Sequence, residues 1–290
     1  MKVDESKPEV AVVYAVGNIQ MGEGSDEVIG SERISKAIRE ARKDSKVKAI
    51  VLRVNSPGGS GLASDIIWRE VMLAKKEKPL VVSMGDMAAS GGYYISCPAH
   101  KIYAQPNTLT GSIGVFGVIP NIKGLLNNKL GITVDGVKTN DHADFGYIYK
   151  PLTEFERAVL QQNVDHFYTD FVEKVADGRN MTVKEVKEIG SGRIWSGLDA
   201  KDKGLIDEFG TLQDAIEDAA AMAEVKDYRV KELPELKDPF DEFFGSFGAN
   251  VRSKILKNEL GNTYQYFDYL KQVTEMEPIQ ARIPFQYDIH

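Results

Sequence analysis

The sequence predicts an α/β fold built on a mainly parallel sheet of βαβ units. Short apolar segments of strand length alternate, over the first 120 residues, with longer segments whose apolar residues recur at helical spacing. Two of the predicted strands lead into glycine-rich corners, NSPGGS at 55–60 and AASGG at 88–92. Strands that alternate with helices in this way usually pair in parallel through right-handed crossovers. Functional groups are then expected where strands turn into helices.

The predicted strands are short and apolar, and several end at glycine, proline or asparagine. They are 9–16 (EVAVVYAV), 47–54 (VKAIVLRV), 79–84 (PLVVSM), 101–104 (KIYA) and 115–119 (VFGVI). The strand at 47–54 is almost continuously apolar, which is typical of a strand covered on both faces. Residues 17–30 are polar and contain glycine, so they predict an exposed excursion.

Helices are predicted between these strands from the 3.6-residue period of apolar side chains. Ser31 is the expected N-cap of the first helix, whose inward positions are Ile34, Ala37, Ile38 and Ala41. A second helix is expected near 62–76, and a third contains Ser90. The inward residues expected for the second helix are Leu62, Ile66, Met72 and Leu73.

The carboxy-terminal half has a different pattern. Residues 151–224 are expected to be mostly helical, with apolar residues at helical spacing: Leu152, Phe155, Val159, Leu160, Val164, Phe167 and Phe171. We place a domain boundary after residue 224, so that 1–224 form the main domain and 225–290 an aromatic tail. Its aromatic residues predict docking on the core or on a neighbouring subunit, since such a patch is rarely left in water: Phe240, Phe243, Phe244, Phe247, Tyr264, Tyr266, Phe267 and Tyr269.

Composition excludes several classes of protein. Of the 290 residues 27% are charged and 42% apolar, with a net charge of -7, so no basic stripe exists for a nucleic acid. The single cysteine, Cys97, excludes an internal disulfide or a cysteine-built zinc site, and we expect it to be a small buried residue. No run of 18 apolar residues and no signal peptide is present, so the chain as written is expected to be soluble. Nothing in the sequence indicates a metal or a cofactor.

Ser90 lies at a corner suited to acyl transfer. If it begins a helix, nearby backbone N–H groups point outward at the positive end of the helix dipole. Acyl transfer needs a nucleophile beside N–H donors for the tetrahedral oxyanion, and losing one such donor costs about 2.7–4 kcal/mol. Gly91 and Gly59 can present amides without a Cβ in the way, and Gly58 is an alternative to Gly59. The opposing interpretation is that small residues here serve only tight helix packing.

Four motifs in order resemble the signal peptide peptidase A (protease IV) family of the Clp/crotonase superfamily. They are VNSPGGS, SMGDMAASGGYYIS, TLTGSIGVFGV and GRIWSGLDAKDKGLIDEFG, within a match from about residue 9 to 222. The resemblance implies a Clp/crotonase-like fold with a helical C-terminal extension. It also implies a serine endopeptidase with Ser90 as nucleophile, which degrades signal peptides left in the membrane. Homo-oligomers that enclose their active sites are typical of the family.

The general base implied by the resemblance is a lysine about fifty residues after the serine. In this chain the loop is VKTNDHADFGYIYK, and Ala143 stands at the lysine position. The family's double-length form divides the dyad between two homologous halves, and its carboxy-terminal half bears the serine. We therefore expect this chain to correspond to that half, with Met1 a boundary within a longer protein. The lysine and a membrane anchor would come from the amino-terminal half, at the extracytoplasmic face of the bacterial inner membrane.

Substitute bases are available in the sequence. Lys138 and Lys150 flank the loop, although an exposed lysine with a pKa near 10.4 would not serve as a base. A Ser-His arrangement would need His142 or His100, oriented by Asp144 or Asp86.

Ser112, in TGSIG, either supports the dyad or substrate, or caps a turn.

Two other functions are also compatible with the sequence. A serine without its base is nearly inert, so the chain can be a non-catalytic assembly module. A crotonase-type enzyme acting on acyl-CoA shares the fold, but it predicts a carboxylate where position 90 has a hydroxyl.

Overall fold

The computed structural model describes residues 6–235 and 279–282. It divides into two compact units. Among the described residues, unit 1 contains 6–116, 164–235 and 279–282, and unit 2 contains 117–163.

The main sheet of unit 1 is almost entirely parallel. The main order is β11-β9-β7-β5-β1-β13. Outside this order, β8 pairs with β7, and β12 pairs with β8. Only β11 runs antiparallel to its neighbour, β9. The strands are β1 (Glu9–Val16), β5 (Val47–Ser56), β7 (Leu80–Ala89), β8 (Lys101–Ala104), β9 (Leu109–Gly111), β11 (Ile194–Ser196), β12 (Glu208–Phe209) and β13 (Arg229–Leu233). The predicted parallel α/β sheet of βαβ units is confirmed.

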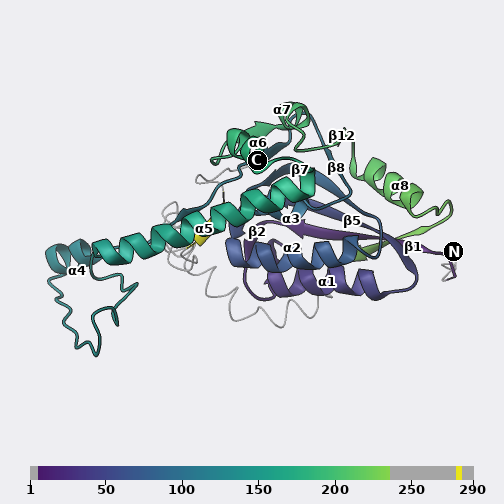
Figure 1. Ribbon diagram of the computed structural model, residues 1–290. Helices are drawn as coiled ribbons and strands as arrows, with labels where there is room; N and C mark the ends of the chain where they lie inside the picture. The colour runs from purple at the N-terminus through teal and green to yellow at the C-terminus, as the bar shows by residue number, and fades with distance from the viewer. Residues whose placement is uncertain (1–5, 236–278, 283–290) are drawn as a thin grey trace. The chain divides into compact units, whose positions relative to one another are not determined.

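Alternation along the strands gives this sheet two apolar faces. Ala11 and Val13 of β1 belong to a core with helices α1 (Ser31–Lys43), α2 (Gly61–Lys75) and α3 (Gly91–Ser96). Val10 and Val12 face the other way, toward α8 (Leu212–Met222). Figure 1 shows α1 and α2 side by side on one face and α8 on the other. Burial on both faces explains why the sequence of β5 is continuously apolar.

Two details of the helices differ from the sequence prediction. The N-cap of α1 is Gly30, and Ser31 is already helical, because its hydroxyl accepts a hydrogen bond from the Gly22 amide (3.2 Å). The predicted inward residues Ile34, Ala37, Ile38 and Ala41 are confirmed.

The inward face of α2 was predicted incorrectly. Leu62 is 56% exposed, and Ile66, Met72 and Leu73 are only partly buried. The helix instead buries a face made mostly of small residues together with Ile67 and Glu70: Gly61, Ala63, Ser64, Ile67, Glu70, Val71 and Ala74. The reason is close packing, since a Cβ on Gly61 would lie 2.7 Å from the ring of Phe167. Side-chain size alone therefore points to the wrong face.

Strand ends also differ. β7 continues to Ala89, five residues past its predicted end, because Met87–Ala89 pair with β9. The strand predicted at 115–119 is reduced to β10 (Phe116–Gly117).

A second sheet includes the predicted excursion at 17–30, which is largely exposed but hydrogen-bonded. The sheet also includes β6, so that GGS of the first glycine corner is a short strand rather than a turn. Its order is β10-β14-β6-β2-β4-β3. The strands not yet given are β2 (Asn18–Gln20), β3 (Gly24–Ser25), β4 (Val28–Gly30), β6 (Gly58–Ser60) and β14 (Ile279–Arg282).

The predicted helical character of 151–224 is confirmed. A long helix, α5 (Glu154–Arg179), begins in unit 2 and ends in unit 1, and α6 (Val183–Ile189) and α7 (Gly197–Asp202) follow it. Unit 2 also contains α4 (Lys123–Lys129). Capping boxes begin α6 and α8, at Thr182 with Glu185 and at Thr211 with Asp214.

The boundary predicted at residue 224 stays a prediction. Beyond it, β13 pairs in parallel with β1, and β14 pairs with β6. The aromatic residues between Phe240 and Tyr269 lie outside the described residues. Within 6–235 and 279–282, no helix is long and apolar enough to cross a membrane.

Leu52 provides a test of the central sheet. It is fully buried in β5, so Leu52→Ala removes apolar contacts and leaves a cavity. We expect a loss of about 2–5 kcal/mol in the free energy of unfolding, measured by urea denaturation. Lys48→Ala, at an exposed position on the same strand, should change it by less than about 0.5 kcal/mol. Equal losses for the two variants would contradict the assignment of β5 to the core.

Candidate active site

Ser90 occupies a strained turn between β7 and α3. Its φ and ψ are 52° and -115°, a region that costs a residue with a Cβ about 1–3 kcal/mol. Two backbone hydrogen bonds hold the turn: the Ser90 amide donates to the Gly111 carbonyl (2.8 Å), and the Tyr94 amide donates to the Ser90 carbonyl (2.8 Å). A strained serine at a sharp strand-to-helix turn is also the arrangement that displays the nucleophile in α/β-hydrolases. Ser112 and Ser191 also have positive φ values, so it is the position of Ser90 at the strand-to-helix turn, together with its strain, that indicates a function.

The Ser90 hydroxyl is buried and has one hydrogen bond among the described residues of unit 1. Its Oγ donates to the Gly114 carbonyl at 3.3 Å. A backbone carbonyl accepts a hydrogen bond but cannot remove the proton. This bond orients the hydroxyl, and a general base has to come from elsewhere.

Ser112 lies on the same loop as Gly114, but its hydroxyl bonds to Gly192 and not to Ser90. Its φ is 49°, its amide donates to the Arg193 carbonyl (2.7 Å), and its Oγ donates to the Gly192 carbonyl (3.4 Å). These contacts fix the loop that presents the Gly114 carbonyl to Ser90. They give Ser112 a structural role without a contact to the Ser90 hydroxyl.

The two glycine corners of the sequence meet beside Ser90. A Cβ placed on Gly58, whose φ is 99°, would lie 2.7 Å from the Gly91 amide nitrogen. The Gly58 amide donates to the Ser56 hydroxyl (3.1 Å) and is therefore occupied. Gly59 is in β6, opposite Ile19 of β2 and Ala281 of β14. The structure thus brings Ser90, Gly58, Gly59 and Gly91 together.

Close backbone contacts explain why the residues after Ser90 are glycines. A Cβ on Gly91 would lie 2.6 Å from the Ser64 hydroxyl and 2.9 Å from the Ala281 carbonyl oxygen. A Cβ on Gly92 would lie 2.8 Å from the Ser56 carbonyl oxygen. The glycines after Ser90 are therefore required by tight packing, whatever their part in the chemistry.

Tyr94 anchors α3 from the other side, a feature that the sequence interpretation missed. Its hydroxyl donates to Asp65 of α2 (2.8 Å), and the Lys174 ammonium of α5 contacts both groups. Burial and the Asp65 carboxylate raise the pKa of Tyr94 far above its usual value, so it stays neutral. In the sequence, the feature that could have indicated this anchor is the aromatic pair Tyr93 and Tyr94 shortly after Ser90.

Lys138 and Lys150, the two lysines that flank Ala143 in unit 2, are held in ion pairs. Lys138 contacts Asp144 (3.4 Å), and Lys150 contacts Asp144 (3.1 Å) and Glu156 (2.7 Å). The hydrogen bond to Glu156 and that to Asp144 raise the pKa of Lys150. A general base requires the opposite shift. Ala143 lies in the exposed turn beside them.

The histidines make other contacts. His100 Nδ1 accepts a hydrogen bond from the Leu80 amide (3.1 Å), and burial lowers the pKa of this imidazole. His142 stacks on Phe155 with 4.0 Å between ring centroids. In the described residues neither imidazole has a hydrogen bond to Ser90, Asp86 or Asp144.

Cys97 is fully buried, and burial raises the pKa of its thiol to about 12. The prediction that Cys97 is a small buried residue is confirmed.

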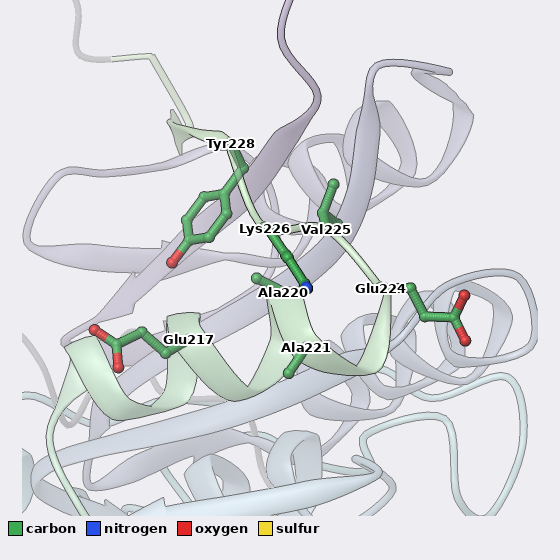
Figure 2. Close-up of a pocket in the computed structure, with 7 residues that line it drawn as sticks. All are labelled: Glu217, Ala220, Ala221, Glu224, Val225, Lys226 and Tyr228. Atoms are coloured by element: carbon green, nitrogen blue, oxygen red, sulfur yellow. The ribbon is translucent and has the colours of Figure 1, made fainter.

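A hollow of about 540 Å³ lies at the end of α8 (Figure 2). It is on the face of the sheet covered by α8, whereas α3 and Ser90 are on the other face. It is lined by the charged residues Glu217, Glu224 and Lys226, by Tyr228, and by Ala220, Ala221 and Val225. It does not belong to the candidate site.

Comparison with known proteins identifies similar sequences. The model of peptidase family S49 matches residues 72–226. Protease 4 of Salmonella typhi is 42% identical over 247 residues, covering 85% of this chain and 40% of that protein. The chloroplastic serine protease SPPA of Arabidopsis thaliana is 34% identical over 282 residues, covering 96% of this chain and 41% of that protein. The chain thus spans about two fifths of the length of either relative.

One similar solved structure is a ClpP1 mutant from Listeria monocytogenes. It has a TM-score of 0.47 and 17% identity, covering 71% of this chain and 94% of that chain.

Gly92 and Gly124 form a matched pair for testing the packing at the corner. Both are helical, but a Cβ on Gly92 meets the Ser56 carbonyl at 2.8 Å, whereas a Cβ on Gly124 meets nothing within 4 Å. Gly92→Ala should lower the stability of unit 1 by about 1–3 kcal/mol despite the better helix propensity of alanine. Unfolding is followed by the fluorescence of Trp68 and Trp195, both in unit 1. Gly124→Ala should leave that transition unchanged, and an unchanged transition for Gly92→Ala would refute the close contact.

Proposed function

Because this chain belongs to peptidase family S49, we propose that it supplies the serine side of a Ser-Lys endopeptidase. The observation on which this rests is Ser90, held in a strained strand-to-helix turn where two glycine corners meet. Backbone strain of this kind persists where the surrounding structure enforces it, and it clusters at active sites. Together with the convergence of the two glycine corners, this strain favours a nucleophile over simple tight packing.

The proposed reaction follows the chemistry of acyl-enzyme hydrolases. Ser90 Oγ attacks the peptide carbonyl carbon while a neutral lysine takes the hydroxyl proton. The amides of Gly59 and Gly91 stabilise the oxyanion of the tetrahedral intermediate. The lysine then gives its proton to the leaving amine, and the C–N bond breaks to form a serine ester. Water hydrolyses the ester through the same base and frees the serine.

We propose that the lysine comes from outside these 290 residues. A working base needs a pKa of about 7–8, a shift of roughly 3 units from an ordinary lysine or about 4 kcal/mol supplied by burial. The candidates inside the chain do not support such a shift. Ala143 stands at the expected position, and Lys150 is paired with two carboxylates that raise its pKa.

The proposed substrates are extended, largely apolar peptides such as signal-peptide remnants. The proposed setting is the extracytoplasmic face of the bacterial inner membrane, in a longer protein whose homologous amino-terminal half supplies the lysine and an anchor. Exposed apolar side chains of unit 2 support assembly into homo-oligomers, because such groups are rarely left in water together. They are Leu125, Leu130, Ile132, Val134, Val137, Phe145 and Phe155.

Covalent labelling tests the nucleophile. In the full assembly, a serine-directed phosphonate should react with Ser90, which peptide mass mapping identifies, and Ser90→Ala should abolish both labelling and peptide hydrolysis. Ser45→Ala, which removes an exposed hydroxyl, should preserve both. If the assembly hydrolyses peptides but Ser90 stays unlabelled, the nucleophile is another residue. Neither activity nor labelling would favour a non-catalytic assembly module.

Charge-preserving variants test the origin of the base. In Lys138→Arg/Lys150→Arg the ion pairs with Asp144 and Glu156 are kept, but a guanidinium cannot act as a base. We expect the kcat/KM of the full assembly for an apolar peptide to stay within about twofold of the unmodified protein, because neither lysine is proposed to act as the base. A twofold change corresponds to only about 0.4 kcal/mol. A fall of a hundredfold or more, about 2.7 kcal/mol, would place the base inside this chain.

A further inference from the structure

Strand β14 is a distant part of the chain that pairs with the glycine corner. It runs antiparallel to β6, with Gln280 opposite Ser60, Ala281 opposite Gly59 and Arg282 opposite Gly58. In the sheet order it lies between β10 and β6. Without β14, the backbone of β6 on that side would be an unpaired strand edge, and such an edge accepts an extended peptide as an added strand.

The carbonyl of Ala281 points at the corner where the oxyanion is proposed to form. Its oxygen lies 2.2 Å from the position of a Cβ on Gly58 and 2.9 Å from that of a Cβ on Gly91. The oxyanion of the substrate is proposed to bind the amides of Gly59 and Gly91, and Ala281 is paired with Gly59 while its carbonyl oxygen lies beside Gly91. Ala281 therefore occupies the place of a substrate residue.

Burial agrees with this placement. Ala281 is 0% exposed and Gln280 is 3% exposed, while the flanking Ile279 and Arg282 are only partly buried. Ser90 itself is 0% exposed. With β14 in place, the proposed nucleophile has no surface open to a peptide from solution.

We propose that Ile279–Arg282 is an internal ligand of the peptide-binding site, and that it competes with substrate for β6. The proposal rests on the peptidase function above. An attached segment has a high effective concentration, so it keeps the site occupied until it is displaced. The enzyme is then latent while β14 is paired and active when it leaves.

The same contacts define the class of ligand that the site takes. A peptide is bound in extended form, antiparallel to β6, through main-chain hydrogen bonds that are independent of its sequence. The residue at the position of Ala281 has to be small, since that position is enclosed. An indole there has no room without backbone shifts.

Two variants at one position test the competition. Ala281→Trp should expel β14, whereas Ala281→Ser, of nearly equal size, should keep it. A fluorescent blocked peptide with the sequence of Ile279–Arg282 is titrated by anisotropy against full-length chains that also carry Ser90→Ala, so that no catalysis is needed. We expect several-fold tighter binding to the Ala281→Trp chain than to the Ala281→Ser chain. In the full assembly with Ser90 intact, phosphonate labelling should be several-fold faster for Ala281→Trp.

The outcomes separate this proposal from the peptidase assignment. If Ala281→Trp binds the peptide no better and labels no faster, or unfolds at lower urea concentration with weaker binding, β14 is a fixed structural strand and the proposal is overturned. If Ala281→Trp binds the peptide more tightly but Ser90 is labelled in neither variant, the internal ligand stands and the peptidase function fails.

Discussion

The close approach of two backbone segments, at Gly58 and Gly91, is the constraint on which the candidate site depends. A Cβ on Gly58 would lie 2.7 Å from the Gly91 nitrogen, so a side chain there would force the corners apart. This contact joins the end of β5 to the start of α3. It also positions the Ser90 turn, because Ser90 directly precedes Gly91 in the chain.

The rest of unit 1 makes this approach possible. β5 and β7 are adjacent parallel strands, so their carboxyl ends reach the same edge and deliver both glycine corners there. Helices on both faces bury most of the residues of these strands, and interiors packed in this way resist small displacements. Strain at Ser90 is therefore maintained by the sheet and by the Tyr94 anchor, rather than by the turn itself.

Charge explains why the proposed nucleophile, Ser90, has no evident base among the lysines near Ala143. Lysine becomes a base near neutral pH when desolvation by burial disfavours its charged form, whereas both lysines near Ala143 are paired with carboxylates, which favour the charged form. The Gly114 carbonyl orients the Ser90 hydroxyl but leaves the proton in place. In the proposed enzyme, the site is inactive until a lysine from outside the chain supplies the base. It also stays inactive until β14 leaves the peptide-binding site.

The sequence by itself determined the parallel sheet, most strand positions and the glycine corners, since periodicity and turn residues are local properties. The buried alanines and isoleucines of α1 followed from the same period. Tertiary structure alone decided the inward face of α2, where contact with Phe167 selects small residues, and the extension of β7 by pairing with β9. It alone placed Ala281 against β6, because a pairing between residues more than two hundred positions apart leaves no local pattern in the sequence.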